Sequence, residues 1–348
     1  MLKKVLVLSF ILLMLVACKP VVDDPYPSVA SDVEVVAEVV EVEAPSVFLD
    51  AQNGIPFRWA HDNQAHPVVR IMAAGFAQGC ADFGIECENM SIPDVDASAV
   101  IALEEQSVVL GSSGQIMCIY APEHYQQATD MIDAGIPVIG VHFPVNPENV
   151  PGLLAWVAPD NIGFAIAVGE AMAEKTSCGS PIGITQSSLN DGENAVEETF
   201  RKTYLELCPD ANVLEVQIEG LDDPAAAILV ASSIIQANPD LVGAFSTTGA
   251  GPTTWAKAAQ ENGREPGEIT IISMDYTRVN LDLVKSGEVY MLVGQPLFEE
   301  FYVAAGLMAL HNMGLPIPKE NVLPAPLITI DNVDKYYAIN DLAESVGE

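Results

Sequence analysis

Residues 116–142 are IMCIYAPEHYQQATDMIDAGIPVIGVH, and this stretch contains the unit from which most of the chain is built. Its two ends, 116–121 and 138–142, are short apolar runs with the length and composition of buried strands. Between them, 124–134 has apolar residues at helical spacing and is followed by Gly135, a residue type that commonly ends a helix. A strand, a helix and a strand in this order predict a parallel β-α-β unit with a right-handed crossover.

The same alternation extends from residue 55 through most of the chain. The runs with the character of strands are 55–60, 85–92, 116–121, 138–142, 153–158, 181–185, 213–218, 242–247, 269–274 and 289–294. The clearest helical runs are 68–83, 124–134, 161–174, 193–207, 224–237, 252–262, 281–286 and 298–312. This pattern predicts an α/β fold with more parallel strands than one small sheet holds. An eightfold β/α barrel alternates in the same way and is the structural alternative.

The charge of the chain limits the ligands that it can bind. Its 348 residues include 14 Lys and Arg against 48 Asp and Glu, a formal net charge of −34. Such an acidic surface repels phosphate backbones, so nucleic-acid binding is not expected, and an anionic substrate is disfavoured. Half of the residues are hydrophobic, which excludes wholesale disorder, and the length suits two lobes better than one core.

The N-terminus has the features of an export and anchoring signal. Lys3 and Lys4 precede an apolar run that is too short to span a bilayer comfortably, which predicts a signal peptide over 1–17. Leu15-Val16-Ala17-Cys18 resembles the bacterial lipobox, which implies that Cys18 is lipidated and holds the protein on a membrane. An ordinary signal peptide or an N-terminal membrane anchor is the alternative.

Residues 18–53 are expected to form an acidic tether. Valine alternates with Glu or Asp between Asp32 and Pro45, and prolines stand on both sides. A flexible spacer is favoured over an ordered edge strand, because the stretch is almost purely acidic and has no obvious pairing partner.

The five remaining cysteines would meet an oxidising compartment after export. Cys178 and Cys208 each precede a predicted strand, and Cys80 and Cys87 flank a helix-to-strand turn, so these two pairs are the disulfide candidates. Cys118 lies inside an apolar run and is expected to be a buried thiol. The sequence has no Cys-x-x-Cys, so thiol redox catalysis and a clustered zinc site are not expected.

Polar residues follow the carboxyl ends of the predicted strands, where open parallel sheets bind ligands. They are His61, Asp62, His66, His142, Phe143, Gln186, Ser187, Ser188, Thr247, Thr248, Asp275, Tyr276 and Gln295. This set is mostly neutral and includes rings, which suits a small hydroxyl-rich ligand held by amide and carboxylate side chains.

Residues 55–340 resemble the solute-binding proteins of sugar ABC importers, of the ribose- and galactose-binding type. The stretches that carry the resemblance are His66-Pro67-Val68-Val69, Ala134-Gly135-Ile136-Pro137, Ala158-Pro159-Asp160-Asn161, Asp275 with Gln295-Pro296, and Thr329-Ile330-Asp331-Asn332-Val333. The resemblance implies two Rossmann-like lobes of the periplasmic-binding-protein type I fold, joined by three crossovers. It also implies a ligand in the cleft between the lobes, which close on it like a hinge.

Only two family positions keep their residue type, since Asp275 and Gln295 match the family's sugar-binding Asp and Gln. The other family positions hold His66 for Asn, Val68 and Val69 for aromatics, His142-Phe143 for Asp-Arg, Val196 for Arg with Asn194 nearby, and Thr248 for Asn. The loss of both arginines argues against ribose. Phe143, Trp59, Tyr276 or Trp255 could supply a ring against the ligand.

Other chemistries receive less support from the sequence. His61, His66 and His142 with Asp62 could converge on a metal, but no helical register fixes the first two, and no metal or cofactor is expected. Asp275 has only Asp62 as a possible carboxylate partner for glycoside hydrolysis. Ser187-Ser188 lacks the Gly-x-Ser-x-Gly turn of hydrolases, so no enzymatic activity is expected.

The sequence therefore predicts a lipid-anchored extracytoplasmic solute-binding protein, on the periplasmic or cell-surface side of a bacterial membrane. It is expected to be a monomer that captures a small neutral polar ligand, a sugar, and delivers it to an ABC permease. The expected parts are 1–17, 18–53, a first lobe of 54–158 with 296–325, and a second lobe of 159–295 with 326–345. The alternatives are a receptor that presents a sugar or furanosyl signal to a sensor kinase, and a nucleoside-binding importer component.

Overall fold

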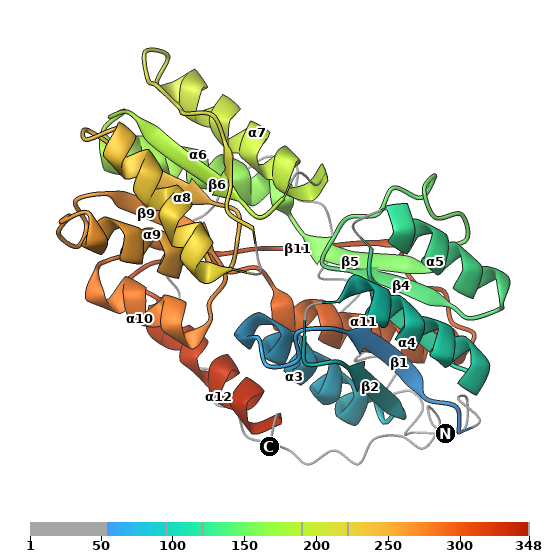
Figure 1. Cartoon of the computed structure of the whole chain (residues 1–348). Coiled ribbons are helices and arrows are strands. Elements are labelled where there is room, and N and C mark those ends of the chain that lie inside the picture. The colour runs from blue at the N-terminus through green and yellow to red at the C-terminus, as the bar shows by residue number, and fades with distance from the viewer. Residues whose placement is uncertain (1–53, 95, 120–121, 189–190, 221–222, 347–348) are drawn as a thin grey trace, which may run out of the picture. The chain divides into compact units, whose positions relative to one another are not determined.

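The computed structural model describes residues 54–94, 96–119, 122–188, 191–220 and 223–346 (Figure 1). The predicted signal peptide, Cys18 and the acidic tether lie outside the described residues. None of the described helices combines the length and the apolar character that crossing a bilayer requires.

The strands form two six-stranded sheets rather than one closed barrel. The first sheet has the order β11-β5-β4-β3-β1-β2, and all its pairs are parallel. Its strands are β1 (Phe57–His61), β2 (Cys87–Ser91), β3 (Gly114–Cys118), β4 (Val138–Val141), β5 (Ala155–Pro159) and β11 (Glu320–Leu323). We call this sheet and its helices the first lobe.

The second sheet has the order β12-β10-β9-β8-β6-β7 and is parallel except for the β10–β12 pair. Its strands are β6 (Ile182–Gln186), β7 (Gln217–Ile218), β8 (Gly243–Ser246), β9 (Thr270–Met274), β10 (Met291–Val293) and β12 (Leu327–Ile328). The chain passes between the sheets after β5, after β10 and after β11, so the predicted three crossovers and the two-lobed α/β fold are confirmed.

Helices cover both sheets. Those of the first lobe are α3 (Pro67–Phe83), α4 (Ala97–Leu110), α5 (Pro122–Asp133) and α11 (Leu297–Asn312). Those of the second lobe are α6 (Asn161–Thr176), α7 (Asp191–Leu207), α8 (Pro224–Ala237), α9 (Gly251–Glu261) and α10 (Arg278–Ser286). Figure 1 shows α6 and α7 side by side, and the two helices pack against each other.

The C-terminal segment contacts both lobes. After the 3₁₀ turn η1 (Val333–Tyr336), helix α12 (Tyr337–Val346) packs against α3 of the first lobe and also contacts α10 of the second. Arg278 of α10 bonds Glu344 at 2.7 Å and Asp341 at 2.5 Å. The segment expected to belong to the second lobe therefore also holds the first.

Several elements differ from the sequence-based expectation, and the C-terminal elements β12, η1 and α12 were not among the predicted runs. Helix α4 was not predicted, because its sequence ASAVIALEEQSVVL has apolar residues on every side and so shows no single apolar stripe. Strand β11 was not predicted either, since its four residues are largely exposed at the edge of the sheet. The run 213–218 was predicted as a full strand, but only β7 pairs regularly and Val213 makes an isolated bridge to Ile182.

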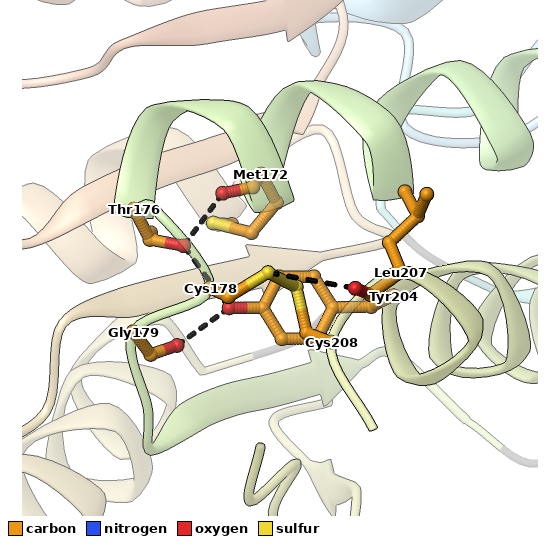
Figure 2. The surroundings of a disulfide bond; sticks show 7 residues. All are labelled: Met172, Thr176, Cys178, Gly179, Tyr204, Leu207 and Cys208. Atoms are coloured by element: carbon orange, nitrogen blue, oxygen red, sulfur yellow. Dashed lines mark hydrogen bonds between the residues drawn. A yellow bond between two sulfur atoms is a disulfide. The ribbon is translucent and has the colours of Figure 1, made fainter. Parts of the chain in front are cut away.

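Each lobe contains one disulfide, and both candidate pairs are joined. Cys80–Cys87 connects the end of α3 to the start of β2. Cys178–Cys208 connects the turn after α6 to the end of α7 (Figure 2). Cys118 is a free thiol whose pKa is raised by burial.

Tyr204 reinforces the second disulfide from α7. Its hydroxyl donates to Gly179 O and lies 3.0 Å from Thr176 Oγ1, which in turn donates to Met172 O at 2.7 Å (Figure 2). The disulfide and these hydrogen bonds hold the ends of α6 and α7 together beside the start of β6.

Candidate ligand-binding site

Two non-glycine residues occupy the left-handed backbone region at equivalent points of the two lobes. His142 follows β4 and has φ 70°, and Asp275 follows β9 and has φ 67°. Each strand is third in the order of its sheet, and each residue donates its N–H to the neighbouring strand, at 2.9 Å, to Val157 O and Val293 O. This conformation costs a non-glycine residue on the order of 1–3 kcal/mol, and such positions cluster at functional sites.

His142 is held by a buried carboxyl group of the first lobe. Its Nδ1 lies 3.1 Å from Glu300 Oε2, and Glu300, in the first turn of α11, has no exposed surface. Burial alone would lower the pKa of His142, but Glu300, Asp275 and Glu193 together raise it above its ordinary value. Burial also raises the pKa of Glu300, against the effect of His142. The Phe143 ring contacts His142 edge-on, with the centroids 4.8 Å apart.

Asp275 is buried without a matching partner. Its side chain is 4 % exposed, and its Oδ1 has no hydrogen-bond partner. Burial raises the pKa of Asp275 to about 7, while His142 acts to lower it and Glu300 to raise it. Asp275 of the second lobe therefore interacts electrostatically with His142 and Glu300 of the first.

Gly249 lets Asp275 and the first lobe approach closely. A Cβ at this position would overlap Asp275 Oδ2 and would lie 3.3 Å from Cγ2 of Val68 on α3. Glycine therefore leaves room for the carboxyl group where the two lobes meet.

Gln295 is the nearest predicted companion of Asp275. It follows β10 by two residues, and β10 pairs with β9, which ends just before Asp275. Its side chain is 9 % exposed. The two residues that match the family's sugar-binding Asp and Gln are therefore buried at adjacent strand ends.

The other predicted polar groups of the second lobe are mostly hydrogen-bonded within that lobe. Gln186 Nε2 donates to Asn194 Oδ1 at 2.8 Å, and Gln186 Oε1 is buried without a partner. Thr248 Oγ1 donates to Glu219 Oε1. The predicted site residues Gln186, Asn194 and Thr248 therefore all form hydrogen bonds within the second lobe. Burial raises the pKa of Glu219, and the hydrogen bond from Thr248 opposes this rise.

Glu193 and Glu300 are site residues that the sequence-based interpretation missed. Glu193, at the start of α7, accepts hydrogen bonds from Ser187 N at 2.7 Å and Thr247 Oγ1 at 2.8 Å. It also contributes to the raised pKa of His142 in the first lobe. Acidic residues at helix starts directly after two predicted site strands were the signal that could have identified both.

Asp62 and His66 have local structural contacts. His66 Nδ1 accepts from Val68 N at 3.3 Å and caps α3, and burial lowers the pKa of His66. Asp62 Oδ2 accepts from Asp96 N at 3.1 Å. Neither residue has a described hydrogen bond to Asp275, so their contact with a ligand remains a prediction.

The histidines and three of the candidate rings have other roles. His61 stacks on Trp59 with the centroids 4.0 Å apart, whereas His142 bonds Glu300, and the described residues contain no cluster of three or more groups suited to a metal. Of the candidate rings, Trp59, Trp255 and Tyr276 are packed in the hydrophobic core. Phe143 is the candidate ring that is only partly buried.

A separate cavity of about 180 Å³ lies beside α3. Its lining includes His61, Gln64, Arg70, Asn89 and, from α12, Ala343. None of Asp275, Gln295 and His142 lines it.

Comparisons with known proteins identify the family. A family model described as a periplasmic binding protein domain matches residues 60–314. The chain belongs to this family. Its members are solute-binding proteins rather than enzymes, as are the similar solved structures. No curated protein matches the chain in sequence.

Three solved structures illustrate the shared fold. A glucose-galactose binding protein from Geobacillus stearothermophilus is 17% identical, with a TM-score of 0.71 over 80% of this chain and 98% of that one. An ABC transporter solute-binding protein from Agrobacterium vitis, bound with α-D-tagatopyranose, is 19% identical, with a TM-score of 0.74 over 81% and 98%. One from Actinobacillus succinogenes 130z, with bound D-allose, is 16% identical, with a TM-score of 0.73 over 81% and 100%.

Proposed function

We propose that the chain is an extracytoplasmic solute-binding protein that captures a sugar-class ligand between its two lobes and delivers it to an ABC importer. The observation that carries this proposal is Asp275. It is buried at a strand end with a left-handed backbone, its Oδ1 has no partner, and it interacts electrostatically with His142 of the opposite lobe. A hydroxyl-rich ligand would supply the missing hydrogen-bond donors.

The mechanism would be capture followed by closure. A ligand that contacts Asp275 and Gln295 on one lobe and the His142 corner on the other binds the closed arrangement better than an open one. Preferential binding of this kind shifts the population toward closure, and the permease would recognise the closed form. The sugars named for the similar structures support the ligand class.

We also propose that lipidated Cys18 anchors the protein, that 18–53 tethers it, and that it acts as a monomer. The lobes would be 54–158 with 296–325 and 159–295 with 326–345, a division that the strand orders support. Replacement of Cys18 by Ser is expected to move the protein from the membrane fraction to the soluble fraction. Cys118→Ser is the matched control, and membrane association that survives Cys18→Ser would contradict the anchor.

Thermal unfolding with a panel of sugars, polyols and nucleosides tests the ligand class. A ligand at 100 times its Kd adds ~2.7 kcal/mol, which corresponds to a rise in Tm of roughly 5–10 °C for a chain of this size. We expect such a rise with a sugar, absent in Asp275→Ala and retained in Glu104→Gln, which removes a buried carboxylate elsewhere. A rise with nucleosides alone would contradict a sugar ligand.

A further inference from the structure

The meeting point of the two lobes is rich in carboxyl groups and poor in positive charge. The charged groups that influence the pKa values of His142, Asp275 and Glu300 are these three residues together with Glu193 and Glu299. No Lys or Arg of the described chain is among them. Against these carboxyl groups the protein therefore supplies one histidine.

The described arginines that form ion pairs do so elsewhere. Arg278, which is closest in sequence to Asp275, pairs with Asp341 and Glu344 of α12. Arg58 pairs with Glu88 on β2, Arg201 with Glu197 within α7, and Arg264 with Glu268 beyond α9. Arg70 lines the separate cavity near α3. None of them compensates the carboxyl groups at the site.

Two carboxyl groups of this cluster are left incomplete within the protein. Asp275 Oδ1 and Glu300 Oε1 are both buried and both lack a hydrogen-bond partner in the described structure. Buried polar atoms in folded proteins nearly always have partners, and an unpaired buried carboxylate is costly. A donor that enters from outside the protein would supply the missing partner.

The charge balance distinguishes between possible donors. A neutral hydroxyl supplies a hydrogen bond, but it leaves the negative charge buried. A protonated amine supplies both the hydrogen bond and the charge, and charge-assisted hydrogen bonds are roughly twice as strong as neutral ones. Burial raises the pKa of Asp275 to about 7 and that of Glu300 above its ordinary value, and a bound ammonium group would oppose both shifts by favouring the charged carboxylates.

We propose that the ligand is a polyhydroxylated ring that carries a protonated amine, an amino sugar or an aminocyclitol, with its ammonium group held by Asp275 and Glu300. This inference rests on the sugar-binding function proposed above and departs from the expectation of a neutral ligand. His142 completes the arrangement as a positioning residue, because its bond to Glu300 Oε2 leaves Oε1 as the oxygen without a partner. The hydroxyl groups of the ring would bind Gln295 and the neighbouring polar groups.

Isothermal titration of the full-length protein with matched sugars tests the proposal. Each set contains a neutral hexose, its 2-amino-2-deoxy form and its N-acetyl form: glucose, glucosamine and N-acetylglucosamine, and the same three for galactose and mannose. Myo-inositol and streptamine form a cyclitol pair. We expect one amine to bind with 1:1 stoichiometry at least about tenfold more tightly than its neutral and N-acetyl counterparts.

Three single variants separate the site from the acidic surface in general. Asp275→Asn and Glu300→Gln keep the shape of the side chain and remove its charge, and each is expected to weaken the amine at least about tenfold. Glu104→Gln makes the same change at a buried carboxyl group on α4 and is expected to leave the affinity unchanged.

The outcomes separate this inference from the proposed function. A neutral sugar that binds as tightly as its amine, or more tightly, would overturn the charged ligand and leave the sugar-binding function standing. An amine preference that persists in both Asp275→Asn and Glu300→Gln would also overturn it, because other residues would then bind the ammonium group. Failure of every sugar and cyclitol, amine and neutral alike, would overturn both.

Discussion

The residues that follow β4 and β9 share a left-handed backbone conformation but differ in their side-chain environments. His142 and Asp275 both adopt a left-handed backbone, both donate to the adjacent strand, and both are third-strand positions in their sheets. His142 has a buried partner, Glu300, in its own lobe, whereas Asp275 Oδ1 has none. The first lobe thus gives His142 an internal partner, with one oxygen of Glu300 still unpaired, whereas Asp275 Oδ1 in the second lobe depends on a ligand.

This difference indicates that His142 contributes mainly to folding stability and Asp275 mainly to ligand binding. A residue with an internal partner contributes to folding, and its removal leaves that partner buried alone. A buried residue without a partner costs folding energy and is useful only when a ligand arrives. The same substitution at the two positions should therefore have different consequences.

His142→Ala is expected to have the largest effect on stability. It leaves Glu300 buried without its partner, which typically costs about 4 kcal/mol in the free energy of unfolding. Urea unfolding would measure the loss. The double variant His142→Ala with Glu300→Gln should recover a large part of it, and a double variant no more stable than the single one would contradict the pairing as the cause.

The two disulfides offer a second comparison between the lobes. Cys80–Cys87 closes a separation of 7 residues and Cys178–Cys208 one of 30. Loop-closure entropy then predicts a loss of about 2.5 kcal/mol for the Cys80→Ser, Cys87→Ser pair and about 3.5 kcal/mol for the Cys178→Ser, Cys208→Ser pair. Guanidinium unfolding of the two double variants checks the order, and a larger loss in the first lobe would contradict it.

Asp275→Ala is expected to weaken ligand binding without lowering stability. Loss of its hydrogen bonds to the ligand should reduce affinity about 100-fold, which is ~2.7 kcal/mol. The ligand-free protein should unfold at an unchanged or higher urea concentration, because an unpaired buried carboxyl group is removed. Titration calorimetry and urea unfolding measure the two quantities, and a ligand-free protein destabilised as strongly as His142→Ala would break the contrast.

Gly249→Ala sharpens the comparison on the side of Asp275. The added Cβ would overlap Asp275 Oδ2, so the carboxyl group must move, at a cost of about 2 kcal/mol in stability. In an Asp275→Ala background the same change should cost clearly less, which a double-mutant cycle by urea unfolding would show. An equal loss of stability in the wild-type and Asp275→Ala proteins would indicate that the added Cβ clashes with Val68 instead.

The pH dependence of the ligand-free protein between pH 7 and 8 is expected to show the smallest effect. Burial raises the pKa of Glu104, in the first lobe, from 4.5 to about 8, and that of Asp275 from 3.8 to about 7. Between the ordinary and raised values the folded state binds more protons than the unfolded state, so stability falls as the pH rises from about 4 to 8.

The two variants should flatten different parts of this slope. Between pH 7 and 8 the free energy of unfolding should decrease by about 1 kcal/mol in the wild type and in Asp275→Asn. In Glu104→Gln this decrease should be absent. Urea midpoints at closely spaced pH values measure this. A fall in that interval that survives Glu104→Gln would assign it to another group.

Much of the fold followed from the sequence, because it depends on local patterns. Short apolar runs alternating with helical runs predicted parallel α/β units. The chain length suited two lobes better than one core, and the family resemblance favoured two lobes over an eightfold barrel. The positions of Cys178 and Cys208 before two predicted strands made them a candidate disulfide pair. Helix α4 has no apolar stripe, and β11 is formed only by pairing with β5, so neither had a local signal.

The site was less predictable than the fold. Asp275 and Gln295 could be named from their places after strands, but Glu300 belongs to a helix that returns to the first lobe and reaches His142 across 158 residues of sequence. Trp59 and Trp255 were predicted as possible ligand-facing rings. Strand β1 and helix α9, which carry them, instead bury both rings in the hydrophobic core. Burial and long-range approach decide these cases, and neither is visible in one stretch of sequence.

The most direct test is calorimetric titration of the tightest ligand found against wild type, Asp275→Ala and Arg70→Ala. The two variants remove one charge each, at the meeting point of the lobes and at the separate cavity beside α3. A site between the lobes predicts that Asp275→Ala weakens binding about 100-fold and that Arg70→Ala leaves it within about twofold of wild type. Retained affinity in Asp275→Ala together with its loss in Arg70→Ala would place the ligand in the other cavity and contradict the assignment.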